Sequence, residues 1–146
     1  AILGNSLRFK FPHPNAPDLD FSFSGLKTSV LNFLKKQTAK EPDFIPANLN
    51  DLCASVQYTI VGILMNRLEQ AVDLTGVNRV ALAGGVAANS GLRHALISHS
   101  NWKTFIPPFE FCTDNAAMIA ITGYYKFLNK DFANQNSSPF ARFTGL

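Results

Sequence analysis

The residues with the clearest chemical potential are two adjacent glycines that follow a short apolar segment. Gly84 and Gly85 come directly after residues 79–83 (RVALA), and Asn89 stands four residues further on. Glycines after a buried strand let the backbone turn sharply and approach a ligand, and the N-terminus of a following helix offers free N–H groups. The Asn89 amide could read ribose or base edges.

This pattern fits an anionic or nucleotide ligand, and a plain strand-to-helix turn with Asn89 as a helix cap is the alternative. The segment matches neither the phosphate loop that ends in GK[ST] nor the GxGxxG fingerprint.

A carboxylate follows the next short apolar segment of the chain. Asp114 stands in the sequence FCTDN (111–115), shortly after a strand candidate at residues 104–106. Loops at the carboxyl ends of strands line the clefts of α/β proteins, so Asp114 could ligate a metal ion. One carboxylate cannot hold a metal alone. The alternative is that Thr113 or Asp114 caps a helix.

Other polar groups do not complete a site. His13, His94 and His99 form neither a pair four residues apart nor an HExxH motif, so a zinc protease of that type is not supported. Cys53 and Cys112 are no disulfide framework, which favours a reducing compartment. We expect Cys53 to be a small core residue on its helix and Cys112 to be buried by packing.

A third segment places Ser24, Gly25 and Lys27 at the start of a predicted helix. These residues could address a phosphate or an RNA backbone. The alternative is a helix capped by Ser22 or Ser24, with a solvated lysine.

The apolar spacing predicts the elements that must position these residues. Helical periodicity runs from residue 24 to about 36, from an N-cap at Asn50 to Thr75-Gly76, from 86 to 99 and from about 113 to 128. Strands are predicted at 79–83 and 104–106, with short alternating candidates at 7–11 and 20–23. Strand, glycine turn, helix and strand make a βαβ unit. The expected fold is helix-rich α/β with a narrow, incomplete sheet.

The composition limits the class of protein. The 146 residues suit one domain, and a net charge of +3 is too small for a tight duplex-binding surface. No apolar run reaches the length of a membrane span, and the N-terminus lacks the pattern of a signal peptide. Only 16% of residues are charged and 13 are Phe. Either these rings pack densely, or apolar surface meets something absent from this chain.

Three segments together resemble one known family. DFSFSGLKT (20–28), ALAGGVAANSGLR (81–93) and FCTDNAAMIAITG (111–123) are similar in order and spacing to the C-terminal half of the TsaD/YgjD family. These are the tRNA N6-threonylcarbamoyladenosine transferases, formerly called glycoproteases or O-sialoglycoprotein endopeptidases. The resemblance implies that residues 1–146 form the C-terminal lobe of an actin-like/Hsp70-like ATPase (ribonuclease H-like) fold. Within it we expect a lead-in over 1–23, an α/β body over 24–130 and an irregular tail over 131–146.

The resemblance also implies an activity and a ligand. The family moves a threonylcarbamoyl group from threonylcarbamoyl-AMP to N6 of adenosine 37, in tRNAs that read codons beginning with A. In the family pattern Asn89 would contact the adenylate, and Gly84 and Gly85 would bring the backbone close to it. Asp114 would be a ligand of a divalent metal, iron or zinc. No catalytic residue is assigned in this chain.

The metal's other ligands, a histidine pair in an upstream segment, are absent here, so we expect this chain alone to be inactive. The expected partners are tRNA and companion proteins similar to TsaB and TsaE. We expect no membrane partner and a location in the cytoplasm. Two alternatives are a metalloprotease acting on O-sialoglycoproteins and a non-catalytic nucleotide-binding module of the actin-like superfamily.

Overall fold

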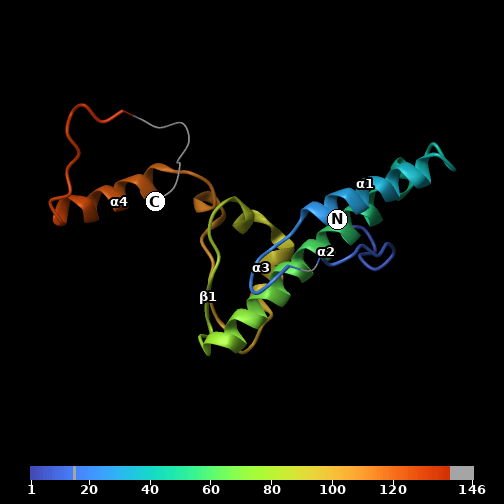
Figure 1. Cartoon of the computed structure of the whole chain (residues 1–146), viewed down its shortest axis with the longest axis horizontal. Coiled ribbons are helices and arrows are strands. Elements are labelled where there is room, and N and C mark those ends of the chain that lie inside the picture. The colour runs from blue at the N-terminus through green and yellow to red at the C-terminus, as the bar shows by residue number, and fades with distance from the viewer. Residues whose placement is uncertain (15, 139–146) are drawn as a thin grey trace. The chain divides into compact units, whose positions relative to one another are not determined.

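The computed structural model describes residues 1–14 and 16–138, and Figure 1 shows the chain as a ribbon. The chain divides into two compact units, Ala1–Cys112 and a second that begins at Thr113. The elements are, in chain order, α1 (Ser24–Thr38), α2 (Phe44–Thr75), β1 (Arg79–Ala81), the 3₁₀ turn η1 (Gly85–Ala88), α3 (Ser90–Ile97), β2 (Lys103–Phe105), the 3₁₀ turn η2 (Phe109–Phe111) and α4 (Ala116–Leu128).

The long helix α2 begins earlier than its periodicity predicted. It starts at Phe44 rather than after Asn50, and it includes Pro46. A proline in the first turn removes no helical hydrogen bond, because the first N–H groups have no acceptor within the helix. The predicted end is confirmed, since Gly76 adopts the left-handed cap conformation with φ 69°.

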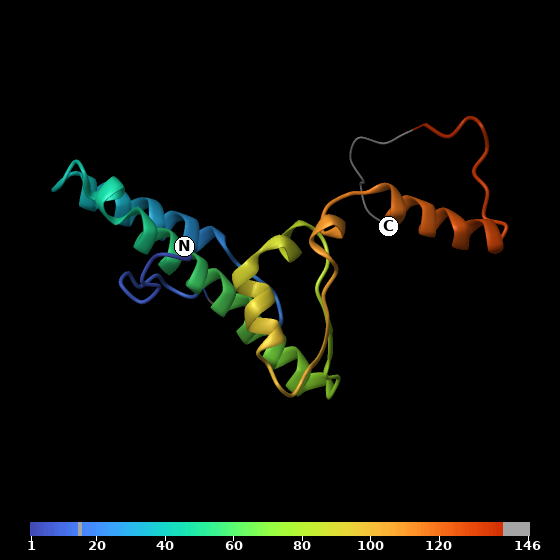
Figure 2. The same ribbon diagram turned by 180° about the vertical axis from the view of Figure 1, so that it is seen from behind.

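Helix α1 lies alongside α2 in both ribbon views (Figures 1 and 2). Its N-cap position is occupied by Phe23, and no side chain caps the helix. The predicted cap by Ser22 or Ser24 is therefore wrong. Packing against α2 holds α1 instead, with Leu26 buried at the contact.

Two hydrophobic clusters form the core of the first unit, and α2 contributes to both. Ile63 packs with Phe11 and Leu26 in the cluster that joins α1, α2 and the N-terminal segment. Leu64 and Leu68 pack against the buried residues of the second cluster, which lie on β1 and α3: Val80, Leu92 and Leu96. A helix that is apolar on more than one side serves as a shared support for its neighbours.

The described residues contain two strands, which pair in parallel with Val80 opposite Thr104. This confirms the predicted strand–helix–strand unit and the helix-rich α/β class. The strands predicted at 7–11 and 20–23 are wrong, since both segments are irregular.

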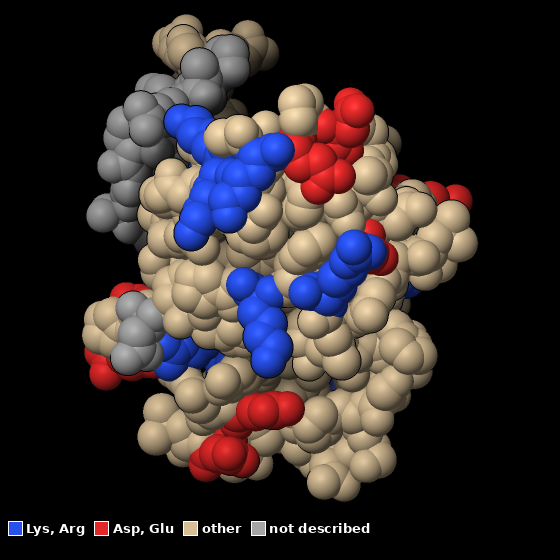
Figure 3. All heavy atoms as spheres, turned by 90° about the vertical axis from the view of Figure 1, so that its right-hand side faces the viewer, with Lys and Arg blue, Asp and Glu red and all other residues tan. Residues whose placement is uncertain are grey.

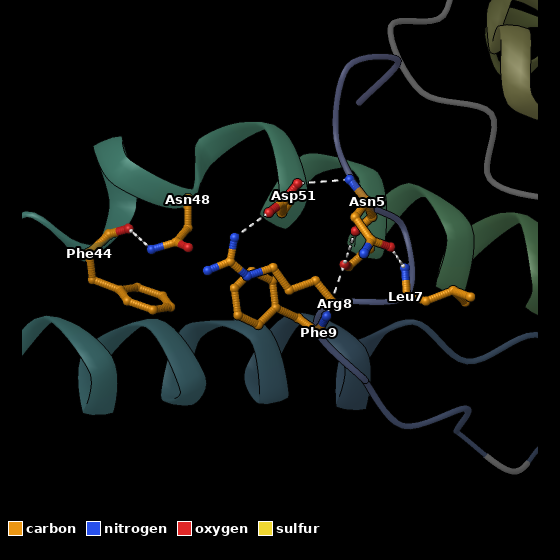
Figure 4. Close-up of polar contacts among 8 residues, drawn as sticks. Asn5, Leu7, Arg8, Phe9, Phe44, Asn48 and Asp51 are labelled. Atoms are coloured by element: carbon orange, nitrogen blue, oxygen red, sulfur yellow. Dashed lines mark hydrogen bonds and ion pairs between the residues drawn. The ribbon is translucent and has the colours of Figure 1, made fainter.

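The N-terminal segment is irregular because α2 supplies its hydrogen-bond partners (Figure 4). Asp51 accepts from the backbone N–H of Asn5 at 2.7 Å and from Arg8 Nη1 at 2.6 Å. Ser55 Oγ accepts from the N–H of Phe9 at 3.2 Å. Within the predicted strand at 7–11, a helix side chain therefore satisfies the N–H of Phe9, which a strand would have presented to a sheet.

The helix predicted over 86–99 is interrupted. Gly85–Ala88 form the 3₁₀ turn η1, Asn89 is extended with ψ 113°, and α3 begins at Ser90. The break has a local cause, because Asn89 Oδ1 accepts from the N–H of Leu92 at 3.0 Å and so caps α3. The helix terminus lies beyond the glycines rather than directly at them.

The second unit contains α4, which begins at Ala116 rather than near Thr113. Its cap is Asn115, whose Oδ1 accepts from the N–H of Met118 at 3.1 Å, so neither Thr113 nor Asp114 caps it. No residue of α4 is buried. Residues 131–138 form no helix or strand, and the rest of the predicted tail lies outside the described residues.

Some phenylalanines pack together and others are exposed, so both alternatives raised by the composition apply. Phe9, Phe11, Phe33 and Phe44 form one aromatic cluster with ring centroids 5.4 to 5.9 Å apart. Others are exposed: Phe21, Phe23, Phe105, Phe109, Phe111, Phe127 and Phe132. Phe140 and Phe143 lie outside the described residues.

Charged residues make up 16% of the sequence. On the face in Figure 3, basic and acidic groups form small separate patches among uncharged residues. Within residues 1–14 and 16–138, no helix combines the length and apolar character needed to cross a bilayer.

Candidate functional site

The loop after β1 is built on the backbone of Gly84. This residue has φ 74° and ψ −174°, a region that is essentially restricted to glycine. No described atom outside the neighbouring residues lies within 4 Å of a Cβ placed on Gly84 or Gly85. The loop therefore offers an open approach to the backbone, as its sequence predicted, and Gly84 is the glycine whose conformation demands that residue.

Asn89 has a structural task and a free functional group. Its Oδ1 caps α3 through Leu92, which bears out the alternative based on capping. Its Nδ2 makes no hydrogen bond among the described residues and remains available to a ligand. A Cβ on Gly91 would lie 3.3 Å from Asn89 Oδ1 and 2.7 Å from Gln57 Nε2, so two amides crowd the start of α3. Sequence reasoning missed Gln57, because its position in a helical stripe resembles that of any surface residue.

An apolar groove connects two of the three predicted segments. One part of it has a volume of about 500 Å³. It is lined by Phe23 and Lys27 at the start of α1, by residues of α2 and by Val86 of η1. The adjacent part, of about 440 Å³, is lined by residues that include Gln57 and Asn89. Ligand pockets have volumes of this order. The structure thus brings Lys27 and the Gly84–Asn89 loop to one groove.

Cys53 lines the same groove and is exposed, so its predicted place in the core is wrong. It belongs to neither core cluster, although Val56 and Ile60 on the same face of α2 pack against the first. Cys112 is buried at 1% exposure, which confirms the packing predicted for it.

Arg93 joins the loops that follow the two strands, and sequence reasoning did not single it out. Its Nη1 donates to the Ala87 carbonyl at 2.8 Å, and its Nη2 donates to the Pro107 carbonyl at 2.7 Å. The available signal was its spacing, because Arg93 lies one helical turn after Asn89 and so on the same side of α3.

Asp114 belongs to the second unit and is exposed. Asn115 caps α4, and the Asp114 carboxylate makes no hydrogen bond or ion pair within the described residues. No group of three His, Cys, Asp or Glu side chains in those residues could hold a metal ion. Asp114 is therefore free for an external ligand, but the described residues do not form a metal site by themselves.

The comparison with known proteins decides the family. A family model described as "TsaD: tRNA N6-adenosine threonylcarbamoyltransferase" matches residues 1–121. The chain belongs to the TsaD family. The match includes the Gly84–Asn89 loop, the groove and Asp114, so these features lie in the part of the chain that the family shares.

Several relatives carry the same name as the TsaD family model. A tRNA N6-adenosine threonylcarbamoyltransferase of Christiangramia forsetii is 52% identical over 143 residues, which are 96% of this chain and 42% of the relative. One of Cytophaga hutchinsonii is 53% identical over 142 residues, 95% of this chain and 41% of the relative. One of Porphyromonas gingivalis is 51% identical over 144 residues, which are 97% of this chain and 42% of the relative. The chain thus spans about two-fifths of the length of these relatives.

Proposed function

We propose that the full-length protein containing this chain transfers a threonylcarbamoyl group from threonylcarbamoyl-AMP to N6 of adenosine 37, in tRNAs that read codons beginning with A. In this reaction N6 attacks the carbamoyl carbon and loses a proton. The bond from that carbon to the phosphate oxygen breaks, and AMP leaves. The main support is the TsaD match over residues 1–121, together with relatives about half identical that are named for this transfer.

In this proposal the loop after β1 holds the adenylate. Gly84 and Gly85 leave the backbone open to a close approach, and Asn89 presents an unengaged amide beside a groove of suitable size. Ligands of α/β proteins bind at the carboxyl ends of parallel strands, where this loop lies. We assign the loop to binding and orientation, which accelerate a transfer by fixing the reacting atoms in place.

Asp114 would supply one ligand of a divalent metal, iron or zinc, in the full-length protein. The other ligands would come from parts of the family's chain that this sequence does not include. Support comes from the free, exposed carboxylate of Asp114. The proposal predicts that Asp114→Asn lowers the metal content of the full-length protein, measured by elemental analysis. Asp73→Asn, which alters an exposed carboxylate of α2, is the control. Equal metal content in both variants would remove Asp114 from the ligand set.

The wider architecture belongs to the same proposal. We place the chain as the C-terminal lobe of an actin-like ATPase fold, with adenylate between this lobe and the rest of the protein. Companion proteins similar to TsaB and TsaE would help it to act on tRNA in the cytoplasm. The small net charge of +3 fits a protein that needs companions to hold tRNA.

The test is a transfer assay on the full-length protein with tRNA and threonylcarbamoyl-AMP, comparing two variants of Asn89. Asn89→Ser keeps a residue that caps helices but removes the amide, so stability is retained. We expect kcat/KM to fall by about tenfold, because a lost hydrogen bond costs about 1.5 kcal/mol. Asn89→Ala removes both the amide and the cap. Asn101→Ser is the matched control, because its side chain is exposed and makes no hydrogen bond among the described residues.

The outcomes separate the hypotheses. If the wild-type protein forms no modified adenosine, the proposed transfer activity is wrong. Binding of the adenylate without transfer would then identify a nucleotide-binding module. If Asn89→Ser acts like Asn101→Ser, Asn89 is a helix cap and not a ligand residue.

A further inference from the structure

The Arg93 guanidinium contacts three points of the chain, which lie in two loops. It donates to the carbonyl of Ala87 after β1 at 2.8 Å and to the carbonyl of Pro107 after β2 at 2.7 Å. Its Nη1 also lies 3.5 Å from Sγ of Cys112. One side chain thus ties together the two loops at the carboxyl ends of the parallel strands.

These contacts begin where the backbone pairing of the strands ends. The last such bond runs from the N–H of Leu82 to the carbonyl of Phe105 at 2.9 Å. Beyond it, no backbone hydrogen bond of the described structure joins residues 83–89 to residues 106–112. The hydrogen bonds that join these two loops in the described structure are therefore those of Arg93.

The surroundings make this link stiff. Ala87 is fully buried and Cys112 is 1% exposed, so the contacts lie at a poorly hydrated place. Hydrogen bonds from a charged donor are the stronger kind. No carboxylate within residues 1–14 and 16–138 forms an ion pair with Arg93, so its positive charge is not neutralised behind the loop.

The geometry needs an arginine. A guanidinium is a planar fork with several donors, so it reaches two carbonyls in different directions at once. The single ammonium of a lysine would keep the charge but would not hold the same two acceptors in the same fixed plane.

We propose that Arg93 is a positioning residue that sets the spacing of the Gly84–Asn89 and Pro107–Cys112 loops, and thereby the geometry in which the first loop meets the adenylate. This inference rests on the proposed function of that loop. The backbone N–H of Arg93 also donates to the Asn89 carbonyl at 3.0 Å, so a shift of α3 moves Asn89 with it.

The test uses the full-length protein with tRNA and its companion proteins, and compares Arg93→Lys and Arg93→Gln with wild type. Arg79→Lys is the matched control, because Arg79 is exposed on β1 and its side chain makes no hydrogen bond among the described residues. Two quantities are measured: kcat and KM for threonylcarbamoyl-AMP, and the rate at which N-ethylmaleimide labels Cys112. Peptide mass spectrometry resolves that rate, with the exposed Cys53 as internal reference.

For Arg93→Lys we expect a higher KM and a kcat/KM lower by roughly 100-fold, the cost of misplacing reacting groups by about 1 Å. The labelling of Cys112 relative to Cys53 should rise by about tenfold or more as the loops separate. Arg93→Gln, which also removes the charge, should likewise raise KM, lower kcat/KM and speed the labelling of Cys112. Arg79→Lys should match wild type in both measurements.

A wild-type KM and kcat in Arg93→Lys would overturn the proposal. It would also be overturned by a lower kcat with unchanged KM and unchanged labelling ratio, since that pattern means only a smaller folded fraction. If the wild-type protein transfers nothing, the proposed function fails. In that case the labelling ratio and the binding of a non-hydrolysable adenylate analogue still decide whether Arg93 sets the loops.

Discussion

Gly84 and Gly85 are neighbours with different physical roles. Gly84 has φ 74° and ψ −174°, whereas Gly85 begins η1 without a positive φ. Space does not distinguish them, because both have open surroundings among the described residues. Backbone conformation alone therefore decides which one must be glycine.

We expect Gly84→Ala to lower the free energy of unfolding by about 1–3 kcal/mol, because an L side chain is strained at this φ and ψ. Gly85→Ala should change it by less than about 0.5 kcal/mol. Urea unfolding of both variants measures the difference. Equal losses in the two variants would show that the strain at Gly84 is not what shapes the loop.

Asp51 anchors the N-terminal segment by charge. The backbone N–H of Asn5 and then the Arg8 guanidinium hold the pKa of Asp51 below its ordinary value. A lowered folded-state pKa means that the ionised form stabilises the fold. The stabilisation is complete above the pKa of the unfolded chain, about 3.9, and is lost as the pH falls through the lower folded-state pKa.

We therefore expect wild type to exceed Asp51→Asn in free energy of unfolding at neutral pH, and this gap to close below about pH 4. Urea unfolding at a series of pH values measures it. Asp73→Asn, on the same helix and without an ion pair among the described residues, should show no such closing gap. A gap that is constant with pH would mean that Asp51 acts by packing and not by charge.

At the scale of elements, α3 joins the candidate loop to the core. Asn89 caps it, Arg93 extends from it towards both loops, and Leu92 and Leu96 bury its other side against α2 and β1. The loop is thus held from a rigid helix, which is how binding groups obtain a fixed geometry.

Neighbouring residues of α3 provide a matched pair for this packing. Leu96 is 1% exposed and Ile97 is 66% exposed. We expect Leu96→Ala to cost about 2–5 kcal/mol, because it removes apolar contacts and leaves a cavity. Ile97→Ala should cost less than about 0.5 kcal/mol. Thermal unfolding of both variants measures this, and a comparable cost at Ile97 would indicate that another surface covers it.

At the scale of the whole molecule, the chain exposes apolar surface and spans about two-fifths of its relatives. The exposed Phe105 and Phe109 and the exposed residues of α4 are surfaces of this kind. Exposed patches of this type are typical of interfaces. We attribute them to the rest of the full-length protein or to its companions.

We expect the 146-residue chain alone to form no threonylcarbamoyladenosine on tRNA and to bind less than one equivalent of zinc or iron. The reason is that its described residues hold a single candidate metal carboxylate and no group of three ligands. Mass spectrometry of tRNA nucleosides and elemental analysis measure the two quantities, with full-length protein as the positive control. Modified tRNA produced by the chain alone would contradict this prediction.

Local features were predictable from the sequence because their causes are local. The glycine turn and the left-handed cap at Gly76 follow from side-chain types a few residues apart. The family was predicted from the resemblance of three short motifs to the TsaD family, and the comparison confirmed it.

Tertiary structure decided the features that depend on partners distant in the sequence. The alternating segment at 7–11 did not become a strand, because Ser55 of α2 accepts from the N–H of Phe9, and Asn5 accepts from the N–H groups of Leu7 and Arg8. Cys53 lies outside the core because it lines the open groove, and neither cluster includes it. Arg93 acquired its role from carbonyls that meet only when β1 and β2 pair. Residue type sets what a group can do, and packing sets which groups it meets.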